Sequence, residues 1–210
     1  MLINIEGISG AGKTKVIETL QELVCNNCLS LGGFNVKEHS TELTKFCRML
    51  TRKNHMIKLP IISELHLLIA EITMDIHDNV IPALKENRFV FYENYWNSIM
   101  FYETSIATIF YRGDARLIEY IHKIMEVSEE YYKIPQPDFT IFVDCEIDTA
   151  VKRIEKREQK CLMGDDIEIL KEVKRLYLDN PPNKKSFFLW NDAPNRDLKA
   201  ELSKMLQEMR

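Results

Sequence analysis

Residues 1–16 read MLINIEGISGAGKTKV, and this stretch decides the fold. An apolar run, typical of a buried strand, ends at Gly7, and the pattern G-x-x-x-x-G-K-[ST] is completed by Gly12, Lys13 and Thr14. Apolar side chains then recur at helical spacing. A glycine-rich turn between a strand and a helix directs backbone N–H groups inward, and the helix N-terminus adds partial positive charge. The stretch therefore predicts a loop that binds the phosphates of a nucleoside triphosphate. The alternative interpretation is a glycine-rich turn that matches the pattern by chance and has no ligand.

The residues of this phosphate loop have separate expected roles. We expect the Lys13 ammonium to reach the β- and γ-phosphate oxygens of ATP, and the Thr14 hydroxyl to bind Mg²⁺. The pattern does not identify the molecule that would accept a phosphate. The predicted nucleotide-binding residues are Gly7, Ser9, Gly10, Ala11, Gly12, Lys13, Thr14 and Lys15.

Length and composition indicate one compact globular domain spanning residues 1–210. The net charge is −4 and no long basic block is present, which argues against a nucleic-acid-binding surface. The most apolar helical stretch is interrupted by Glu64 and Glu71, so we expect no membrane span. The N-terminus carries no basic leader before its short apolar run, and we therefore expect a cytoplasmic protein.

The five cysteines are scattered. Cys25 and Cys28 have a spacing found in zinc and redox sites, but the chain offers no second pair that would complete a zinc site. We interpret the pair as two reduced thiols on one face of a helix.

Apolar patterns alternate between strand and helix along the whole chain. Alternating strands and helices imply a parallel sheet covered on both sides, so we predict a three-layer α/β/α P-loop NTPase fold with five parallel strands. Asp114 and Asp148 are expected to cap helices. The expected strands occupy residues 2–6, 34–38, 89–93, 139–144 and 186–190. The expected helices lie at 13–30, 41–53, 61–86 with a break at Pro82, on both sides of Gly113, after Asp148, at 166–178 and at 195–209.

Five segments resemble, in the same order, the thymidylate kinase and deoxynucleoside kinase group of P-loop kinases. They are IEGISGAGKT, KEHSTELTKF, VIPALKENRFVFYENYWNS, PDFTIFVDCEIDTAVKRIEKRE and DDIEILKEVKRLYLDN. The resemblance implies an ATP-dependent phosphotransferase that acts on a small-molecule acceptor, a nucleoside or a nucleoside monophosphate. It also implies a helical lid at about 153–166 and a possible homodimer.

The resemblance assigns four further site residues beside Lys13. Glu38 would accept the proton of the acceptor hydroxyl, and Glu93 would hold Mg²⁺ together with Thr14 or bind the sugar of the acceptor. Arg153 and Arg157 would neutralise the transferring phosphoryl group from the lid. The residues themselves leave plainer alternatives open: a surface carboxylate for Glu38, a helix cap for Glu93 and a solvated helix face for the arginines. We interpret Asp144, which also ends an expected strand, as structural.

The acceptor side departs from the pattern of the look-alike family. Asn94 stands in the slot of an Arg, His39 replaces a frequent Arg, and the 61–86 helix contains no Arg. A dianionic phosphate in a partly dry cleft needs cationic partners. Either the acceptor is an uncharged nucleoside, or other cations hold a nucleotide, for which the candidates are Arg48, Arg112 and Arg116.

Other side chains could build a base pocket. Glu103 stands where thymidylate kinases often carry Gln. Aromatic side chains could stack on a base or belong to the core, namely Tyr95, Trp96, Phe101 and Tyr102. Two other functions stay open: a kinase of a non-nucleotide metabolite, and an ATP-binding module without transfer activity.

Overall fold

The computed structural model describes residues 1–24, 27–32, 43, 59–180, 185–192 and 197–209. Within these residues the strands form a five-stranded sheet in the order β2-β3-β1-β4-β5, and every neighbouring pair is parallel. The carboxyl ends of all strands therefore meet at one edge of the sheet. The strands are β1 (Leu2–Glu6), β2 (Cys28–Gly32), β3 (Phe89–Glu93), β4 (Phe139–Asp144) and β5 (Ser186–Trp190).

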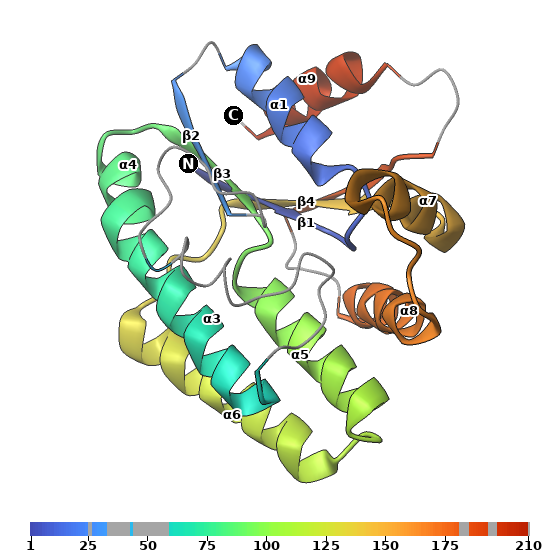
Figure 1. Ribbon diagram of the computed structural model, residues 1–210. Helices are drawn as coiled ribbons and strands as arrows, with labels where there is room; N and C mark the ends of the chain where they lie inside the picture. Colours follow the sequence, from blue (N-terminus) through green and yellow to red (C-terminus); the bar gives the residue numbers. More distant parts are fainter. Residues whose placement is uncertain (25–26, 33–42, 44–58, 181–184, 193–196, 210) are drawn as a thin grey trace.

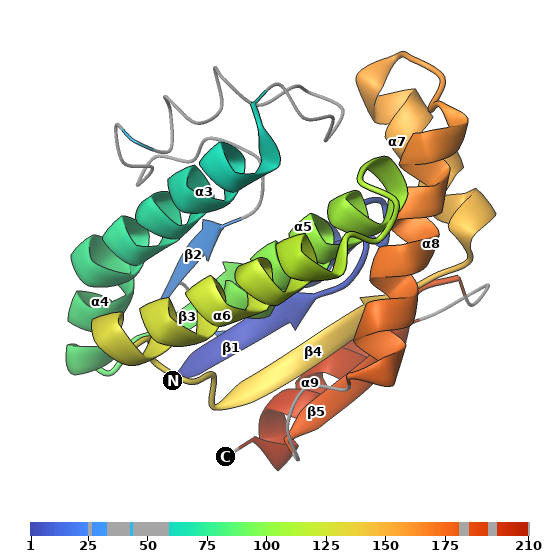
Figure 2. The same cartoon turned by 90° about the horizontal axis from the view of Figure 1, so that it is seen from below.

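Helices cover both faces of this sheet, as Figures 1 and 2 show. One face carries the first and last helices, which pack together, and the other carries the helices from the middle of the chain. Every residue of β1 is buried, as expected of a parallel strand covered on both faces. The helices are α1 (Lys13–Leu23), α3 (Ile61–Asp75), the π-helix η1 (Ile76–Val80), α4 (Ile81–Lys85), α5 (Trp96–Phe110), α6 (Ala115–Tyr132), α7 (Ile147–Glu158), α8 (Gly164–Asp179) and α9 (Leu198–Glu208).

The predicted helix over residues 13–30 is wrong in its second half. The helix ends at Leu23, and Cys28–Gly32 forms β2, in which Leu29 and Leu31 are buried and their neighbours are less so. Burial that alternates from residue to residue is typical of a strand. The apolar helical spacing of α1 therefore does not continue through residues 28–32. Cys28 therefore lies in a strand and not on a helix face. The expected strand at 34–38 and the expected helix at 41–53, apart from residue 43, lie outside the described residues.

The strands predicted at 2–6, 89–93, 139–144 and 186–190 are found with these bounds, and the remaining described helices are found with shifted ends. A kink or division was expected at Pro82 in the 61–86 helix. The helical backbone continues without a gap from α3 through the π-helix η1 into α4, and Pro82 is the second residue of α4, directly after the π-helical turn. Asp114 caps α6 by accepting hydrogen bonds from the N–H groups of Arg116 and Leu117. The cap predicted at Asp148 is wrong, because Glu146 is the N-cap residue of α7.

The displaced cap has a local cause. The backbone N–H of Glu146 donates to Asp192 Oδ2 at 2.6 Å and holds Glu146 in an extended conformation. The N-cap of α7 therefore lies two residues before the expected position. No helix in the described part of the chain is long and apolar enough to cross a membrane.

Candidate functional site

The phosphate loop connects β1 to α1 at the carboxyl edge of the sheet, and its glycines are required by backbone geometry. Gly7, Gly10 and Gly12 have φ angles of +139°, +83° and +97°, which side chains disfavour. A Cβ atom on Gly7 would lie 2.1 Å from the carbonyl oxygen of Val143, and one on Gly10 would lie 2.5 Å from that of Ala150. The loop is therefore wedged against β4 and α7, and its backbone leaves no room for side chains at these positions.

Lys13 is buried at the first position of α1, with only 4% of its surface exposed. Its ammonium Nζ donates hydrogen bonds to the carbonyl oxygens of Gly7 and Ile8, both at 2.9 Å. Burial lowers the pKa of Lys13, while the negative charges of Glu93 and Glu6 act in the opposite direction. A buried ammonium at a helix N-terminus favours an anionic ligand over the loop.

Thr14 and Glu93 are brought together from distant parts of the sequence. Glu93 ends β3 beside β1, opposite Ile5, and the Thr14 hydroxyl donates to Glu93 Oε2 at 3.3 Å. These two oxygen donors suit a hard cation such as Mg²⁺, which commonly takes only one or two protein ligands beside phosphate oxygens and water. Among the described residues, no group of three or more His, Cys, Asp or Glu side chains is placed to hold a metal by itself.

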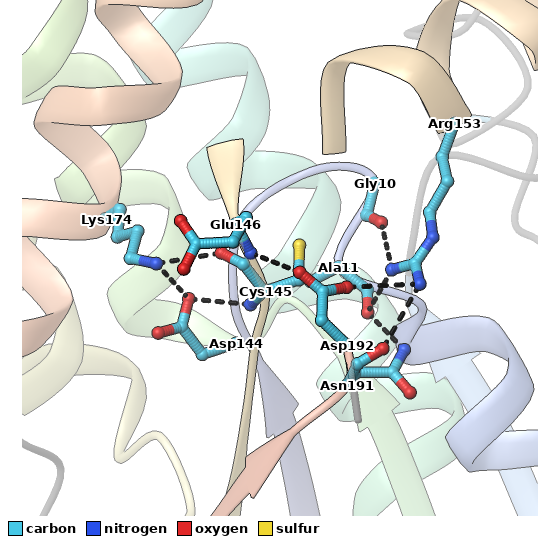
Figure 3. A network of polar contacts seen from close by, with 9 residues as sticks. All are labelled: Gly10, Ala11, Asp144, Cys145, Glu146, Arg153, Lys174, Asn191 and Asp192. Carbon is cyan, nitrogen blue, oxygen red and sulfur yellow. Dashed lines mark hydrogen bonds and ion pairs between the residues drawn. The ribbon is translucent and has the colours of Figure 1, made fainter. Parts of the chain in front are cut away.

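The two arginines predicted to belong to a lid have different surroundings (Figure 3 shows Arg153). The Arg153 guanidinium donates to the carbonyl oxygens of Gly10 and Ala11 at 3.2 and 3.4 Å. It also reaches the Asn191 carbonyl at 3.1 Å and the Asp192 carboxylate at 3.4 Å. Arg153 thus binds the backbone of the phosphate loop from outside.

Arg157 lies one turn further along α7. Its Nε donates to Glu158 at 2.8 Å, and its charge acts on Lys13 and Tyr102. The positive charge of Arg157 thus contributes to the lowered pKa of the buried Lys13.

Sequence reasoning missed Asn191 and Asp192, which follow β5 directly. The Asn191 side-chain amide donates to the carbonyl oxygen of Ala11 at 2.6 Å, and a Cβ on Gly12 would lie 2.2 Å from Asn191 Nδ2. Polar residues at the carboxyl ends of parallel strands lie at the ligand-binding edge of the sheet, as Glu93 does, and the same rule applied to β5 would have found this pair.

Asp144 is buried at the end of β4 and belongs to a polar network. It forms an ion pair with Lys174 of α8 at 2.9 Å and accepts the N–H of Cys145 at 2.8 Å, while Lys174 also donates to the Cys145 carbonyl (Figure 3). Burial, with the nearby charge of Asp192 next in importance, raises the pKa of the Cys145 thiol to about 11. Cys145 is thus a protonated, unreactive thiol.

The aromatic residues expected to line a base pocket mostly belong to the core. Tyr95, Trp96 and Phe101 are buried, and the Tyr95 hydroxyl donates to the carbonyl oxygen of Pro135. Tyr102 binds the phosphate loop instead: its hydroxyl accepts the backbone N–H of Ser9 at 2.9 Å.

Glu103 is the least expected group on the acceptor side. It is 1% exposed, and its Oε2 has no hydrogen-bond partner within the described residues. Burial raises its pKa well above the usual range, and the facing Glu64 of α3 adds to the increase. A carboxyl group in this position is therefore held largely protonated, so it can donate one hydrogen bond and accept another.

Of the cations proposed as substitutes for the lost Arg, the two that the structure describes, Arg112 and Arg116, do not lie at this edge. Asn94 follows β3 with a φ of +59°, and its backbone N–H donates to the Ile5 carbonyl. Arg112 and Arg116 are exposed beyond the far end of α5, a helix of 15 residues and so about 22 Å long. Glu38, His39 and Arg48 lie outside the described residues.

Comparisons with known proteins agree with one another. The family model "Thymidylate kinase" matches residues 5–201. A probable thymidylate kinase of Archaeoglobus fulgidus is 30% identical over 209 residues, which cover 99% of this chain and 95% of the relative. A thymidylate kinase of Clostridium novyi is 27% identical over 194 residues, covering 87% and 86%. The crystal structure of thymidylate kinase from Ehrlichia chaffeensis has the same fold, with a TM-score of 0.63 at 20% identity, covering 99% of this chain and 98% of that one.

Proposed function

Since the chain belongs to the thymidylate kinase family, we propose that it transfers the γ-phosphoryl group of ATP to thymidine monophosphate. The family consists of P-loop nucleotide kinases, so the protein is an enzyme, an ATP-dependent phosphotransferase with a nucleoside monophosphate as acceptor. The observation that carries the proposal is the joint position of Lys13, Thr14 and Glu93 at one edge of the sheet.

Phosphoryl transfer needs positioning and charge neutralisation more than covalent chemistry from the protein. The buried Lys13 ammonium and the first N–H groups of α1 would bind the β- and γ-phosphates. Arg157 would add positive charge as the phosphoryl group moves. A Mg²⁺ ion held by Thr14 and Glu93 would neutralise phosphate charge, and the Thr14–Glu93 contact of 3.3 Å supports this pair as ligands. Arg153 would act through the backbone of the loop that it binds.

The acceptor would lie between α3 and α5, on the same side of the sheet as Glu93. Glu38 would orient the attacking oxygen, and this role remains a proposal from the family resemblance alone. Glu103 would offer one donor and one acceptor, the same pair that a Gln amide offers. Cytoplasmic location and a homodimer are also parts of the proposal, by analogy with the family.

The first test replaces Lys13 by Ala and measures ADP release with ATP, Mg²⁺ and thymidine monophosphate. We expect the rate to fall about 100-fold or more, because one charged group that stabilises the transition state is lost. The fold should persist, since taking the Lys13 ammonium out of water opposes folding and its removal relieves that cost. Lys123→Ala, which removes an exposed lysine of α6, is the control. A Lys13→Ala variant as active as the control would refute the mechanism.

The second test concerns the metal. Glu93→Gln should raise the Mg²⁺ concentration for half-maximal rate about tenfold. The substitution replaces the carboxylate ligand by a neutral amide and leaves the Thr14 hydroxyl as the other protein ligand. Glu86→Gln, an exposed change shortly before β3, should leave the Mg²⁺ dependence unaltered. An identical Mg²⁺ dependence in both variants would remove Glu93 from the metal site.

The third test identifies the acceptor by measuring ADP release with thymidine monophosphate, other nucleoside monophosphates, thymidine and amino alcohols. Turnover of thymidine without turnover of any monophosphate would mean that the loss of Arg at position 94 has changed the acceptor class.

A further inference from the structure

A buried carboxylate lies directly behind the phosphate loop. Glu6 is the last residue of β1, is 1% exposed, and precedes Gly7. Its Oε1 accepts a hydrogen bond from the side-chain amide of Asn4 at 2.7 Å. Its Oε2 accepts hydrogen bonds from the hydroxyl groups of Tyr177 at 2.5 Å and of Ser98. Three donors from β1, α5 and α8 thus converge on one carboxylate.

The charge of Glu6 acts on the catalytic side of the loop. It is one of the negative charges that oppose the effect of burial on Lys13. Burial raises the pKa of Glu6, while the three hydrogen bonds and Lys13 lower it. Taking a carboxylate out of water costs several kcal/mol, and an apolar side chain of similar size would avoid this cost. A buried carboxylate in the core therefore lowers stability relative to an apolar side chain. Residues that lower stability in this way are expected at functional sites.

The network also connects the loop to two helices. Ser98 and Tyr102 lie one turn apart on α5; Ser98 binds Glu6, and Tyr102 binds the N–H of Ser9 in the loop. Tyr177 belongs to α8, which follows the turn after α7 and packs beside α5, as Figures 1 and 2 both show. The Tyr177 ring packs edge-on against Phe101 with 4.8 Å between ring centroids. The tyrosine is therefore held firmly by its ring, and its hydroxyl has one defined position.

We propose that Glu6, Ser98 and Tyr177 form a positioning network for the ATP side of the reaction. The network fixes the start of the phosphate loop, and through it the Lys13 ammonium, relative to α5 and α8. None of its three members touches substrate; each acts through the loop. This inference rests on the proposed kinase function, but it concerns only the binding and transfer of the ATP phosphates and not the identity of the acceptor.

The experiment compares Tyr177→Phe and Ser98→Ala with Ser105→Ala. Ser105 is a second fully buried serine of α5, whose hydroxyl donates to the Phe101 carbonyl of its own helix. Ser105→Ala loses one buried hydrogen bond, whereas Tyr177→Phe and Ser98→Ala each lose the bond to Glu6 and the 2.7 Å contact between the Ser98 and Tyr177 hydroxyl groups. We therefore expect the unfolding midpoint to fall less for Ser105→Ala than for the other two variants. We expect kcat to fall about tenfold and ATP affinity to fall severalfold for Tyr177→Phe and Ser98→Ala, with the KM for thymidine monophosphate within twofold.

Ser105→Ala should keep the kcat and both affinities of the unmodified enzyme. Equal kcat values in all three variants, whatever their losses of stability, would show that the network is merely structural and would overturn the proposal. An increase of both KM values together would do the same, because a general distortion of the site does not distinguish ATP from the acceptor.

A double-mutant cycle with Glu6→Gln tests whether the tyrosine acts through the carboxylate. Gln keeps the shape of Glu6 and removes its charge, and we expect it to lower kcat at least tenfold. Adding Tyr177→Phe to Glu6→Gln should lower kcat no further, whereas multiplied losses would contradict a common route. Calorimetric titration with ATP and Mg²⁺ needs no acceptor. If it shows weakened binding while no monophosphate is phosphorylated even by the unmodified enzyme, the network stands and the proposed acceptor fails.

Discussion

Replacing Glu103 by Gln should change how the stability of the protein depends on pH. Glu103 is buried, its Oε2 lacks a partner within the described residues, and burial holds its pKa well above the usual range, with Glu64 as a second cause. Gln has nearly the same shape and cannot ionise. The difference between the two proteins therefore isolates the titration of a single carboxyl group.

The sign and size of the effect follow from proton linkage. Below about pH 4.5 the Glu103 carboxyl is protonated in both the folded and the unfolded chain, so it adds no pH dependence. Above that pH the unfolded chain loses the proton while the folded chain keeps it, and the free energy of unfolding falls as pH rises. The loss approaches about 1.4 kcal/mol per pH unit until the raised pKa is reached. Between pH 5 and pH 6.5 this amounts to about 2 kcal/mol.

Urea unfolding of both proteins at pH 5, 5.75 and 6.5 measures the difference directly. We expect Glu103→Gln to gain about 2 kcal/mol relative to the unmodified protein across this range. Glu119→Gln, an exposed substitution on α6, should show no such gain. Parallel stability profiles for Glu103→Gln and the unmodified protein would refute the reasoning, because the folded carboxyl would then ionise at its ordinary pH.

Two further predictions concern backbone fit and ion pairing. Gly7→Ala should abolish ATP binding and lower the unfolding midpoint, because the added Cβ would lie 2.1 Å from the Val143 carbonyl oxygen. Gly164→Ala, whose added Cβ would have no other atom within 4 Å, should be neutral or slightly stabilising. Lys174→Met leaves the buried Asp144 carboxylate without its ion-pair partner, and the free energy of unfolding at pH 7 should fall by about 3 to 5 kcal/mol in urea titrations. A loss below about 1 kcal/mol would mean that Asp144 does not need this partner.

The parts of the fold that sequence reasoning predicted depend on short local patterns. The phosphate loop combines glycines, a lysine and a threonine over eight residues, and the Asp114 cap depends on N–H groups two and three residues away. The first residues of β2 were assigned to the preceding helix because their apolar side chains also continue its spacing. The pairing of β2 with β3 decides between the two interpretations, and pairing partners 61 residues apart, such as Cys28 and Phe89, are not a local pattern.

The site was predicted in part for the same reason. Glu93 was identified through the family resemblance, and its contact with Thr14 follows from the parallel pairing of β1 and β3. The outward position of Arg153 could not be predicted, because it depends on where the turn after β5 crosses the loop. The pairing of Asp144 with Lys174 depends on the placement of α8 in the same way.

The sequence by itself determined the class of fold, the phosphate-binding chemistry and the family, since these follow from the order and spacing of neighbouring residues. Only the tertiary structure decided which charged groups are buried together. Burial determines how unfavourable a charge is. The groups that stabilise the charges of Glu6 and Lys13 come from β1, α1, α5 and α8, which are far apart in the chain.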